Sequence, residues 1–112
     1  MTRATLIAVV LLGFVPSEAE AAAAWINGNE LWTWCQKTVG KNFEPLGAGS
    51  CSGFIAGVLD ALNGSSMCVP ESVTRGQQID VVRLYLGAHP EQRHYGGAVL
   101  VAMAFQEKFP CN

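Results

Sequence analysis

The sequence predicts an all-α fold, a small disulfide-stapled bundle of four helices. Four successive segments place their apolar residues at helical spacing, and no segment alternates apolar and polar residues as a half-buried strand does. Four cysteines occur in a short chain that opens with an export-type leader, a combination typical of small disulfide-bonded domains. We expect the helices at residues 28–40, 50–64, 74–88 and 90–109.

The first 21 residues have the pattern of a signal peptide. Arg3 precedes an apolar block over residues 4–15, and small residues at 19–21 predict cleavage near residues 21–24. As a helix the block spans roughly 18 Å, well short of the ~30 Å hydrocarbon core, so a membrane anchor is the weaker alternative. Cleavage leaves residues 22–112, about 90 residues, which is enough for a single helical domain.

The first predicted helix lies in the stretch NGNELWTWCQKTVG. Leu31, Trp34 and Cys35 share one face, and Glu30 lies in the first turn, where a carboxylate favours the helix dipole. The following stretch, KNFEPLGAGS, contains one proline and two glycines. It predicts a loop over residues 41–50.

The second predicted helix has the clearest periodicity. Its apolar residues follow the i, i+3, i+4, i+7 pattern and are Cys51, Phe54, Ile55, Val58, Leu59 and Leu62. Ser50 is the expected N-cap, and Gly64 is the expected stop. The small residues Gly53, Gly57 and Ala61 recur four apart, and we expect a neighbouring helix of the domain to approach them closely. Dimerisation of membrane-spanning helices is the alternative interpretation of this row.

The third predicted helix starts from a capping box, in which Thr74 precedes Gln77 by three residues. Its inward-facing residues are Ile79, Val82, Tyr85 and Leu86. Pro90 ends it and can open the fourth helix as its first residue. The stripe expected along the fourth helix consists of Tyr95, Ala98, Val99, Ala102, Phe105 and Phe109.

Charge on this chain is low and balanced. The formal net charge is −2, and acidic and basic residues are interspersed rather than grouped in blocks. This distribution gives no basic surface for nucleic acid or for anionic lipid. We therefore expect neither partner, and no membrane association after signal cleavage.

The four cysteines of a short exported chain predict two disulfides, and four buried free thiols are the weaker alternative. A zinc site is weaker still, because no close C-x₂₋₄-C pair occurs. Cys51 and Cys68 flank the second helix and are held ~25 Å apart, far beyond disulfide reach. This excludes Cys51–Cys68, and Cys35–Cys111 with it. Short connections make neighbouring helices antiparallel, which brings together Cys35 with Cys51 and Cys68 with Cys111. The predicted bridges are Cys35–Cys51 and Cys68–Cys111.

The residues capable of catalysis or metal binding form no convincing group. His89 precedes a proline at a helix boundary, where capping explains it, and His94 is five residues away, the wrong spacing for two ligands on one helical face. Asp60 and Asp80 fall on solvated faces of separate helices. The sequence therefore predicts neither an enzyme nor a bound cofactor or metal.

Recognition of a partner remains as a role, and two regions could serve it. Trp25, Trp32 and Trp34 cannot all face one core, because residues 32 and 34 point about 200° apart on a helix. One of them could be an exposed anchor, although packing against the other helices is the plainer interpretation. The predicted loop at residues 41–50 is the second candidate region.

Four stretches resemble the Rap/Tai immunity proteins: GNELWTWC, CSGFIAGVLDAL, CVPESVTRGQQIDVVRLYLGAHPEQRH and the closing FPC. These small periplasmic proteins of bacteria with type VI secretion systems bind and block peptidoglycan amidase toxins. The resemblance covers nearly all of residues 22–112. It implies a compact, disulfide-bonded helical domain of the immunity type, often dimeric, and similar in size and location to the HdeA-type acid-stress chaperones.

Two functions follow from this reading. The leading hypothesis is a periplasmic immunity-type protein that neutralises a peptidoglycan amidase by direct binding. A homodimer is the oligomeric state that the resemblance implies. The alternative is an HdeA-like periplasmic chaperone that exposes apolar surface in acid. A small hydrolase is disfavoured because no pair of nucleophile and base can be assembled.

Overall fold

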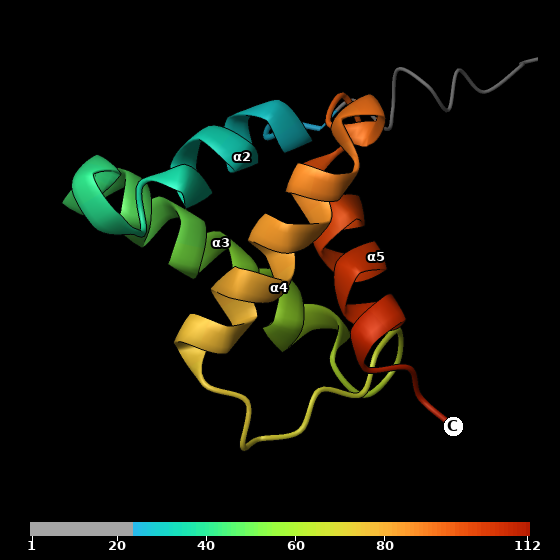
Figure 1. Cartoon of the computed structure of the whole chain (residues 1–112). Helices are drawn as coiled ribbons and strands as arrows, with labels where there is room; N and C mark the ends of the chain where they lie inside the picture. The colour runs from blue at the N-terminus through green and yellow to red at the C-terminus, as the bar shows by residue number, and fades with distance from the viewer. Residues whose placement is uncertain (1–23) are drawn as a thin grey trace, which may run out of the picture.

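The computed structural model describes residues 24–112, so the predicted signal peptide and its cleavage site lie outside the described residues. The described chain forms four α-helices and two short 3₁₀ turns, with no strand longer than an isolated bridge (Figure 1). The predicted all-α bundle is confirmed. The elements are α2 (Gly28–Gln36), η1 (Gly40–Asn42), α3 (Pro45–Leu62), α4 (Arg75–Ala88), η2 (Pro90–Gln92) and α5 (Gly97–Lys108).

Helix α2 is shorter than the sequence predicted. Asn27 caps its start, where the side-chain oxygen accepts a hydrogen bond from the Glu30 backbone N–H at 3.0 Å. The helix ends at Gln36 instead of near residue 40, because Val39 is extended and Gly40 has a φ of 58° that turns the chain. The prediction treated Gly40 as the end of the helix, whereas it starts a 3₁₀ turn.

Helix α3 begins five residues earlier than expected, so the predicted loop at residues 41–50 is wrong in its second half. Pro45 occupies the first helical turn, where its missing N–H costs nothing. The Glu44 carboxylate caps the helix by accepting from the Leu46 and Gly47 backbone N–H groups at 2.8 and 2.7 Å. Ser50 is not the N-cap: it lies inside the helix, and its hydroxyl donates to the Leu46 carbonyl at 2.9 Å.

Helix α4 matches its prediction closely. Both hydrogen bonds of the capping box are present, with Thr74 Oγ1 accepting from the Gln77 N–H and the Gln77 side chain accepting from the Thr74 N–H. Val82 and Leu86 are buried, and the other two predicted inward residues are half-buried. His89 is the C-cap residue, as expected.

The fourth predicted helix is divided in two. Its start at Pro90 is the 3₁₀ turn η2, and α5 begins only at Gly97. The predicted stripe is wrong in its first half, because Tyr95, Ala98 and Val99 are exposed. Helix α5 is apolar on nearly every side, so spacing alone could not identify its buried face. The buried residues of α5 are Gly97, Leu100, Val101, Ala104 and Phe105.

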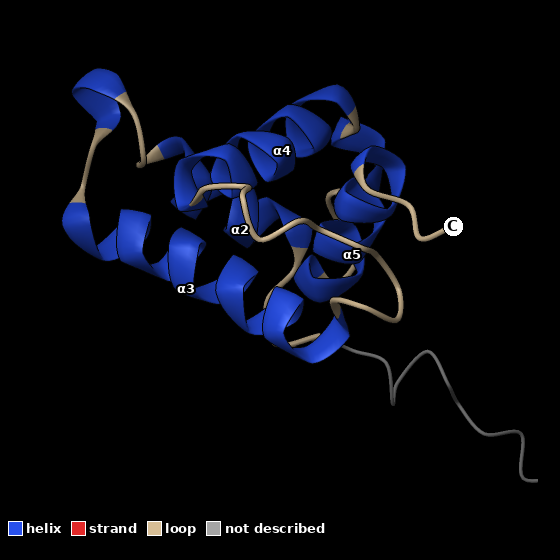
Figure 2. Cartoon of the chain, turned by 90° about the horizontal axis from the view of Figure 1, so that it is seen from below, coloured by secondary structure: helices blue, strands red, loops and turns tan. Residues whose placement is uncertain are grey.

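One core joins the four helices. Helix α3 packs against α2, α4 and α5, and Figure 2 shows it along one edge of the molecule with the other three helices on its inner side. By length and composition α3 could also cross a membrane, although only part of it is buried here. The largest fully buried side chains are Phe105, Leu31, Ile55, Met67, Leu86, Leu100, Val82 and Val101.

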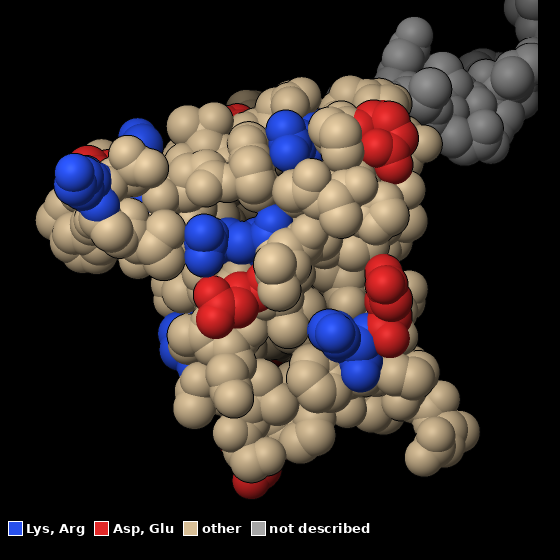
Figure 3. All heavy atoms as spheres, in the orientation of Figure 1, with Lys and Arg blue, Asp and Glu red and all other residues tan. Residues whose placement is uncertain are grey.

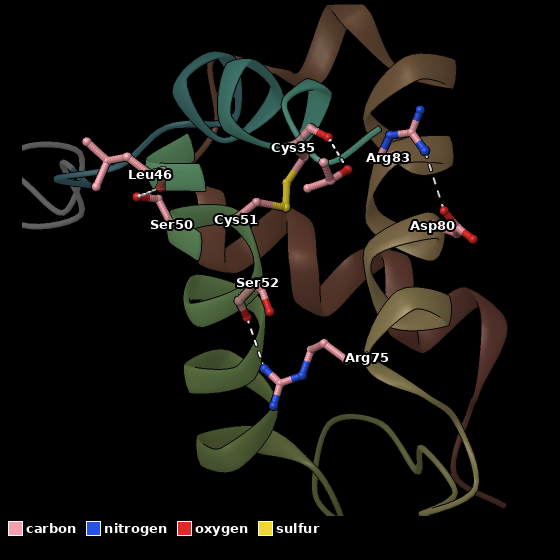
Figure 4. The surroundings of a disulfide bond; sticks show 9 residues. Cys35, Leu46, Ser50, Cys51, Ser52, Arg75, Asp80 and Arg83 are labelled. Atoms are coloured by element: carbon pink, nitrogen blue, oxygen red, sulfur yellow. Dashed lines mark hydrogen bonds and ion pairs between the residues drawn. A yellow bond between two sulfur atoms is a disulfide. The ribbon is translucent and has the colours of Figure 1, made fainter. Parts of the chain in front are cut away.

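The two disulfides connect the pairs that helix geometry had selected. Cys35–Cys51 joins α2 to α3 inside the core, where both cysteines are completely buried (Figure 4). Cys68–Cys111 joins the α3–α4 connection to the end of the chain. Figure 4 also shows Arg75 of α4 donating to the Ser52 carbonyl of α3 at 3.2 Å, a second link between those helices.

Candidate functional site

The two histidines have structural surroundings. The His89 ring packs on Tyr85, with ring centroids 4.2 Å apart, and its Nδ1 lies 3.3 Å from a Glu91 carboxylate oxygen. His94 is exposed and stands edge-on to Tyr95 at 4.5 Å. Across residues 24–112, no three side chains of the His, Cys, Asp and Glu types gather as metal ligands. Their positions suit capping and packing better than ligation.

The two aspartates considered from sequence lie where they were expected, on exposed helix surfaces. Asp80 faces Arg83 of the same helix at 3.4 Å, and Asp60 lies near the end of α3. An exposed pair of this kind contributes at most about 1 kcal/mol to stability. Neither aspartate has a partner arrangement suited to acid–base chemistry.

A shallow cleft of about 160 Å³ lies between α4 and α5, and Tyr85 is one of the residues that line it. Its hydroxyl donates to the Gln92 side-chain oxygen at 2.7 Å. Burial raises the pKa of the Tyr85 phenol, and the Glu107 carboxylate raises it further. The phenol therefore stays protonated at neutral pH, and it serves as a hydrogen-bond donor between α4 and η2.

A protruding knob joins α2 to α3, and we call residues 37–46 the α2–α3 corner. Three apolar side chains on it are well exposed: Val39 at 39%, Phe43 at 59% and Leu46 at 78%. Figure 1 shows the corner standing out from the bundle in the teal and green part of the chain. Exposed apolar side chains on a projecting segment are suited to insertion into a concave partner.

The α2–α3 corner is held rigidly despite its exposure. The Glu44 backbone N–H donates to the Lys37 carbonyl at 3.0 Å, closing the turn, and the Phe43 N–H donates to Gly40 at 3.2 Å. Hydrogen bonds from the Gly47 and Leu46 backbone N–H groups lower the pKa of the Glu44 carboxyl, so it stays ionised as the cap of α3. The buried Cys35–Cys51 bridge fixes the two helices directly behind the turn.

The charged side chains are spread without a dominant sign on the face that Figure 3 displays. Lysine and arginine lie close to acidic residues there, and the corner at the left carries basic side chains. Lys37 and Glu44 of the corner approach each other to 3.9 Å. This face offers no continuous basic surface of the kind that nucleic acid binds.

The exposed side of α3 is a second candidate surface, which we call the α3 open face. It consists of Gly49, Gly53, Gly57 and Ala61, all of which are exposed. The expectation that a helix of this domain packs on the row of Gly53, Gly57 and Ala61 is wrong: a Cβ added at either glycine of the row would meet no neighbouring atom within 4 Å, and the same holds at Gly49. The other helices contact the opposite side of α3, through residues such as Ile55.

A shallow apolar groove runs between the α3 open face and α5. Its volume is about 470 Å³, and its lining residues are Gly53, Phe54, Gly57, Val58, Ala61, Leu62 and Ala98. A second hollow of about 240 Å³ continues from it past Phe54 and Ala98 to Trp25 and Val99. No charged residue lines either hollow. The groove and the α3 open face thus form one uncharged surface.

The three tryptophans lie in different surroundings, as the helix geometry required. Trp25 is 98% exposed beside the second hollow, so it is the one available as an anchor. Trp32 is half-buried beneath the Arg93 guanidinium, 4.1 Å from the ring centroid. Trp34 is half-buried and packs edge-on against Phe54.

Sequence reasoning located the region of the α2–α3 corner but not its exposed apolar residues. Phe43 and Leu46 are apolar, and such residues are expected inside a small domain rather than outside. The available signal was their position: each flanks the Glu44–Pro45 pair that begins a helix, in a stretch without helical periodicity before it.

A comparison with protein-family models found a match, which covers most of the described chain. The model of the Rap1a immunity proteins matches residues 27–111, a span that contains all four helices and both disulfides. No curated protein matches the sequence. Because the family model covers well over half of the chain, the chain belongs to the Rap1a immunity protein family and is an immunity protein for a toxin.

Proposed function

We propose that the toxin is a peptidoglycan amidase and that this domain neutralises it by direct binding. Family membership supports the toxin as partner, and the rigid, protruding α2–α3 corner with its exposed apolar side chains is the observation that supports direct binding. The domain acts as a binding protein and not as an enzyme. The histidines and Tyr85 have roles in capping and packing, which is consistent with that assignment.

Blocking by the α2–α3 corner follows from its shape. Amidase sites must admit a peptide stem and are therefore concave, and a projecting knob can occupy such a cleft. Phe43 and Leu46 would supply the apolar contact area. Because the turn is closed by backbone hydrogen bonds and by the Cys35–Cys51 bridge behind it, little conformational freedom is lost on binding.

We place this activity in the periplasm. The leader predicted in residues 1–21, the two disulfides and a peptidoglycan target all favour an exported protein. In a bacterium with a type VI secretion system, such a protein protects the producer and its siblings from an amidase delivered by a neighbour.

The test is calorimetric titration of the purified domain into purified peptidoglycan amidase toxins of type VI secretion systems. We expect a tight complex that Phe43→Asp and Leu46→Asp each weaken by at least about tenfold, since a charge is then forced into an apolar contact. Leu84→Asp is the matched control, because Leu84 is 69% exposed on a different element, α4. Equal affinities for all three variants would exclude the corner as the contact, and no binding by the wild type would exclude the function.

We also propose that two copies associate through the α3 open face. The face and its groove lack charge, so two copies related by a two-fold axis meet without repulsion. Glycines four apart let two helices approach closely. Helix α3 is about 27 Å long, and a contact strip along it about two helix diameters wide would bury about 540 Å² of surface on each copy. That buried area is near the lower limit for a stable dimer. A weak dimer is therefore expected.

Sedimentation velocity across a range of concentrations tests this association. We expect wild-type dimers at high concentration and monomers of Gly53→Leu, whose side chain would stand in the contact. Gly76→Leu is the control: Gly76 is also an exposed helical glycine with open space around it, but it lies on α4. A wild type that stays monomeric, or a dimer that tolerates Gly53→Leu, contradicts the proposal.

An acid-stress chaperone is the second candidate, and two carboxylates favour it. The pKa of Glu44 is lowered by backbone N–H groups, and that of Glu91 by its own backbone N–H and by His89. The stability they contribute is present above the ordinary carboxyl pKa and is lost as pH falls through their lowered values. A fold loosened by acid would expose further apolar surface beside the α3 open face, and a chaperone needs such surface to bind its clients.

Light scattering of aggregating client proteins at about pH 2–3 separates the two functions. A chaperone suppresses this aggregation at stoichiometric amounts, whereas a dedicated immunity protein leaves it unchanged. We expect no suppression. Strong suppression together with failure to bind the amidase would reverse the order of the two candidates.

A further inference from the structure

The two disulfides differ in their access to solvent. Cys35 and Cys51 are both 0% exposed within the core, between α2 and α3. Cys68 and Cys111 are both exposed. A thiolate must reach a sulfur atom along the S–S axis to reduce a disulfide, so burial protects one bridge and not the other.

The connection on one side of the exposed bridge is anchored independently of it. Met67 is completely buried, and Val69 is 9% exposed. The Asn63 side chain holds Val69 from both sides, accepting from its N–H at 2.8 Å and donating to its carbonyl at 3.2 Å. Opening the bridge would leave all of these contacts in place.

The chain end on the other side is also anchored ahead of the bridge. The Cys68 backbone N–H donates to the Phe109 carbonyl at 2.8 Å, and the Phe109 ring stacks over the fully buried Phe105 with centroids 6.2 Å apart. Pro110, Cys111 and Asn112, which follow this anchor, are exposed. The bridge therefore joins exposed residues, and opening it uncovers little of the core.

We propose that Cys68–Cys111 is a thiol–disulfide exchange site for dithiol reductants, and that its opening leaves the domain folded with Cys35–Cys51 intact. One thiolate of the reductant attacks a sulfur of the bridge, forming a mixed disulfide and releasing the other cysteine as a thiolate. The second thiolate of the reductant then displaces the remaining cysteine. The reductant ends as a disulfide, and Cys68 and Cys111 each take up a proton to become thiols.

The exchange site lies apart from the α2–α3 corner. In Figure 1 the C-terminus is at the lower right, while the corner stands out at the upper left. The proposal consequently does not depend on which toxin the domain binds. Reduction at Cys68–Cys111 is expected to leave binding through the corner unchanged.

Graded reduction of the native protein tests the proposal. The protein is incubated with increasing dithiothreitol and trapped with iodoacetamide, and the modified cysteines are identified by peptide mass spectrometry while far-ultraviolet circular dichroism follows the helices. We expect Cys68 and Cys111 to be alkylated at least about tenfold faster than Cys35 and Cys51, with no loss of helical signal. Alkylation of all four cysteines together, or loss of helix in step with Cys68, would overturn the proposal.

Two controls isolate burial as the cause. In guanidinium-unfolded protein the two bridges should be reduced at similar rates, and a preference that persists there would show that burial is not responsible. In the folded Cys68→Ser/Cys111→Ser variant, Cys35–Cys51 should remain as resistant as in the wild type. A bridge that becomes labile in this folded variant would mean that exchange at the surface opens the core. If the variant does not fold, opening of the bridge unfolds the domain and the proposal fails.

Discussion

At the scale of single residues, Glu44 connects the stability of α3 to the shape of the α2–α3 corner. Its carboxylate accepts two backbone N–H groups at the start of α3, and its own N–H closes the corner onto Lys37. Two backbone hydrogen bonds lower its pKa, so the cap is charged at neutral pH. One side chain thus fixes both the beginning of a helix and the turn that precedes it.

Replacing Glu44 with glutamine should alter the dependence of stability on pH. The lowered pKa means that the ionised carboxylate stabilises the fold above the ordinary carboxyl pKa, and that this contribution disappears as pH falls through the lowered value. The difference in free energy of unfolding between wild type and Glu44→Gln should therefore be largest at neutral pH and vanish in strong acid.

Urea unfolding at neutral pH and at about pH 2 measures this difference. Glu71→Gln is the control, because Glu71 is exposed in the α3–α4 connection and caps none of the described helices. A Glu44→Gln effect that is equally large at both pH values contradicts the assignment.

Met67 is a core residue that lies outside every helix. It is 0% exposed, although it belongs to the α3–α4 connection. Met67→Ala should lower the free energy of unfolding by about 2–5 kcal/mol, because the deleted side chain leaves a cavity. The exposed Leu84→Ala should cost less than about 0.5 kcal/mol. Chemical denaturation measures both, and equal losses would place Met67 outside the core.

At the scale of elements, Gly28 of α2 and Gly53 of α3 have opposite roles. A Cβ on Gly28 would meet the side chain of Leu100 and lie 2.7 Å from the Arg93 carbonyl oxygen and 2.9 Å from the Arg93 Cα. The glycine therefore allows α2 to touch the α4–α5 connection, where the Gly28 N–H donates to the Tyr95 carbonyl at 2.8 Å. Gly53 on the α3 open face has empty space instead.

Alanine at these two positions should have effects of opposite sign. Gly28→Ala should destabilise the domain by about 1–3 kcal/mol, because the neighbouring backbone cannot move aside. Gly53→Ala should stabilise it by up to about 1 kcal/mol, because alanine favours a helix over glycine and meets nothing. Thermal unfolding of dilute protein checks the pair, and a loss of stability in Gly53→Ala would show that the face is covered.

How much of each element could be predicted from sequence depended on its contrast between polar and apolar residues. Helix α4 carries both a capping box and a mixed surface, so its start and its inner face were predicted correctly. Helix α5 is apolar on nearly every side, and its buried face depends on neighbours that periodicity does not reveal. The start of α3 was missed because Pro45 and two glycines suggested a loop, while the Glu44 cap outweighed them.

The candidate surfaces could likewise be located from sequence, whereas their exposure could not. The α3 open face was recognised as a row of small residues, but whether a helix covers it is a tertiary fact. The corner was recognised as a segment, and the exposure of Phe43 and Leu46 depends on where the bundle leaves it. The disulfide pairs could be derived because the length of the second helix separates Cys51 from Cys68, and the antiparallel arrangement of neighbouring helices selects between the two remaining connectivities.

At the scale of the whole molecule, the two disulfides together stabilise a small domain. They close loops of 16 and 43 residues. The chain-entropy model assigns them roughly 3 and 4 kcal/mol, a large part of the 5–15 kcal/mol expected for such a domain. The longer loop belongs to the exposed bridge, so the bridge that reductants reach first also contributes more through chain entropy.

Removing the exposed bridge should therefore weaken the fold without changing it. Cys68→Ser/Cys111→Ser is expected to lower the free energy of unfolding by roughly 4 kcal/mol while the helical signal of the native state is retained. Cys35→Ser/Cys51→Ser should be at least as harmful despite its shorter loop, because two hydroxyl groups are then buried in the core. Guanidinium unfolding compares them, and an exposed-bridge variant as stable as the wild type would contradict the entropic account.

The most direct test of the central claim is a titration of amidase activity with the purified domain. If the domain neutralises a peptidoglycan amidase toxin by occupying its cleft, hydrolysis of peptidoglycan should fall in proportion to added domain and reach zero near one domain per amidase molecule. Undiminished hydrolysis in the presence of excess folded, disulfide-bonded domain would contradict the account.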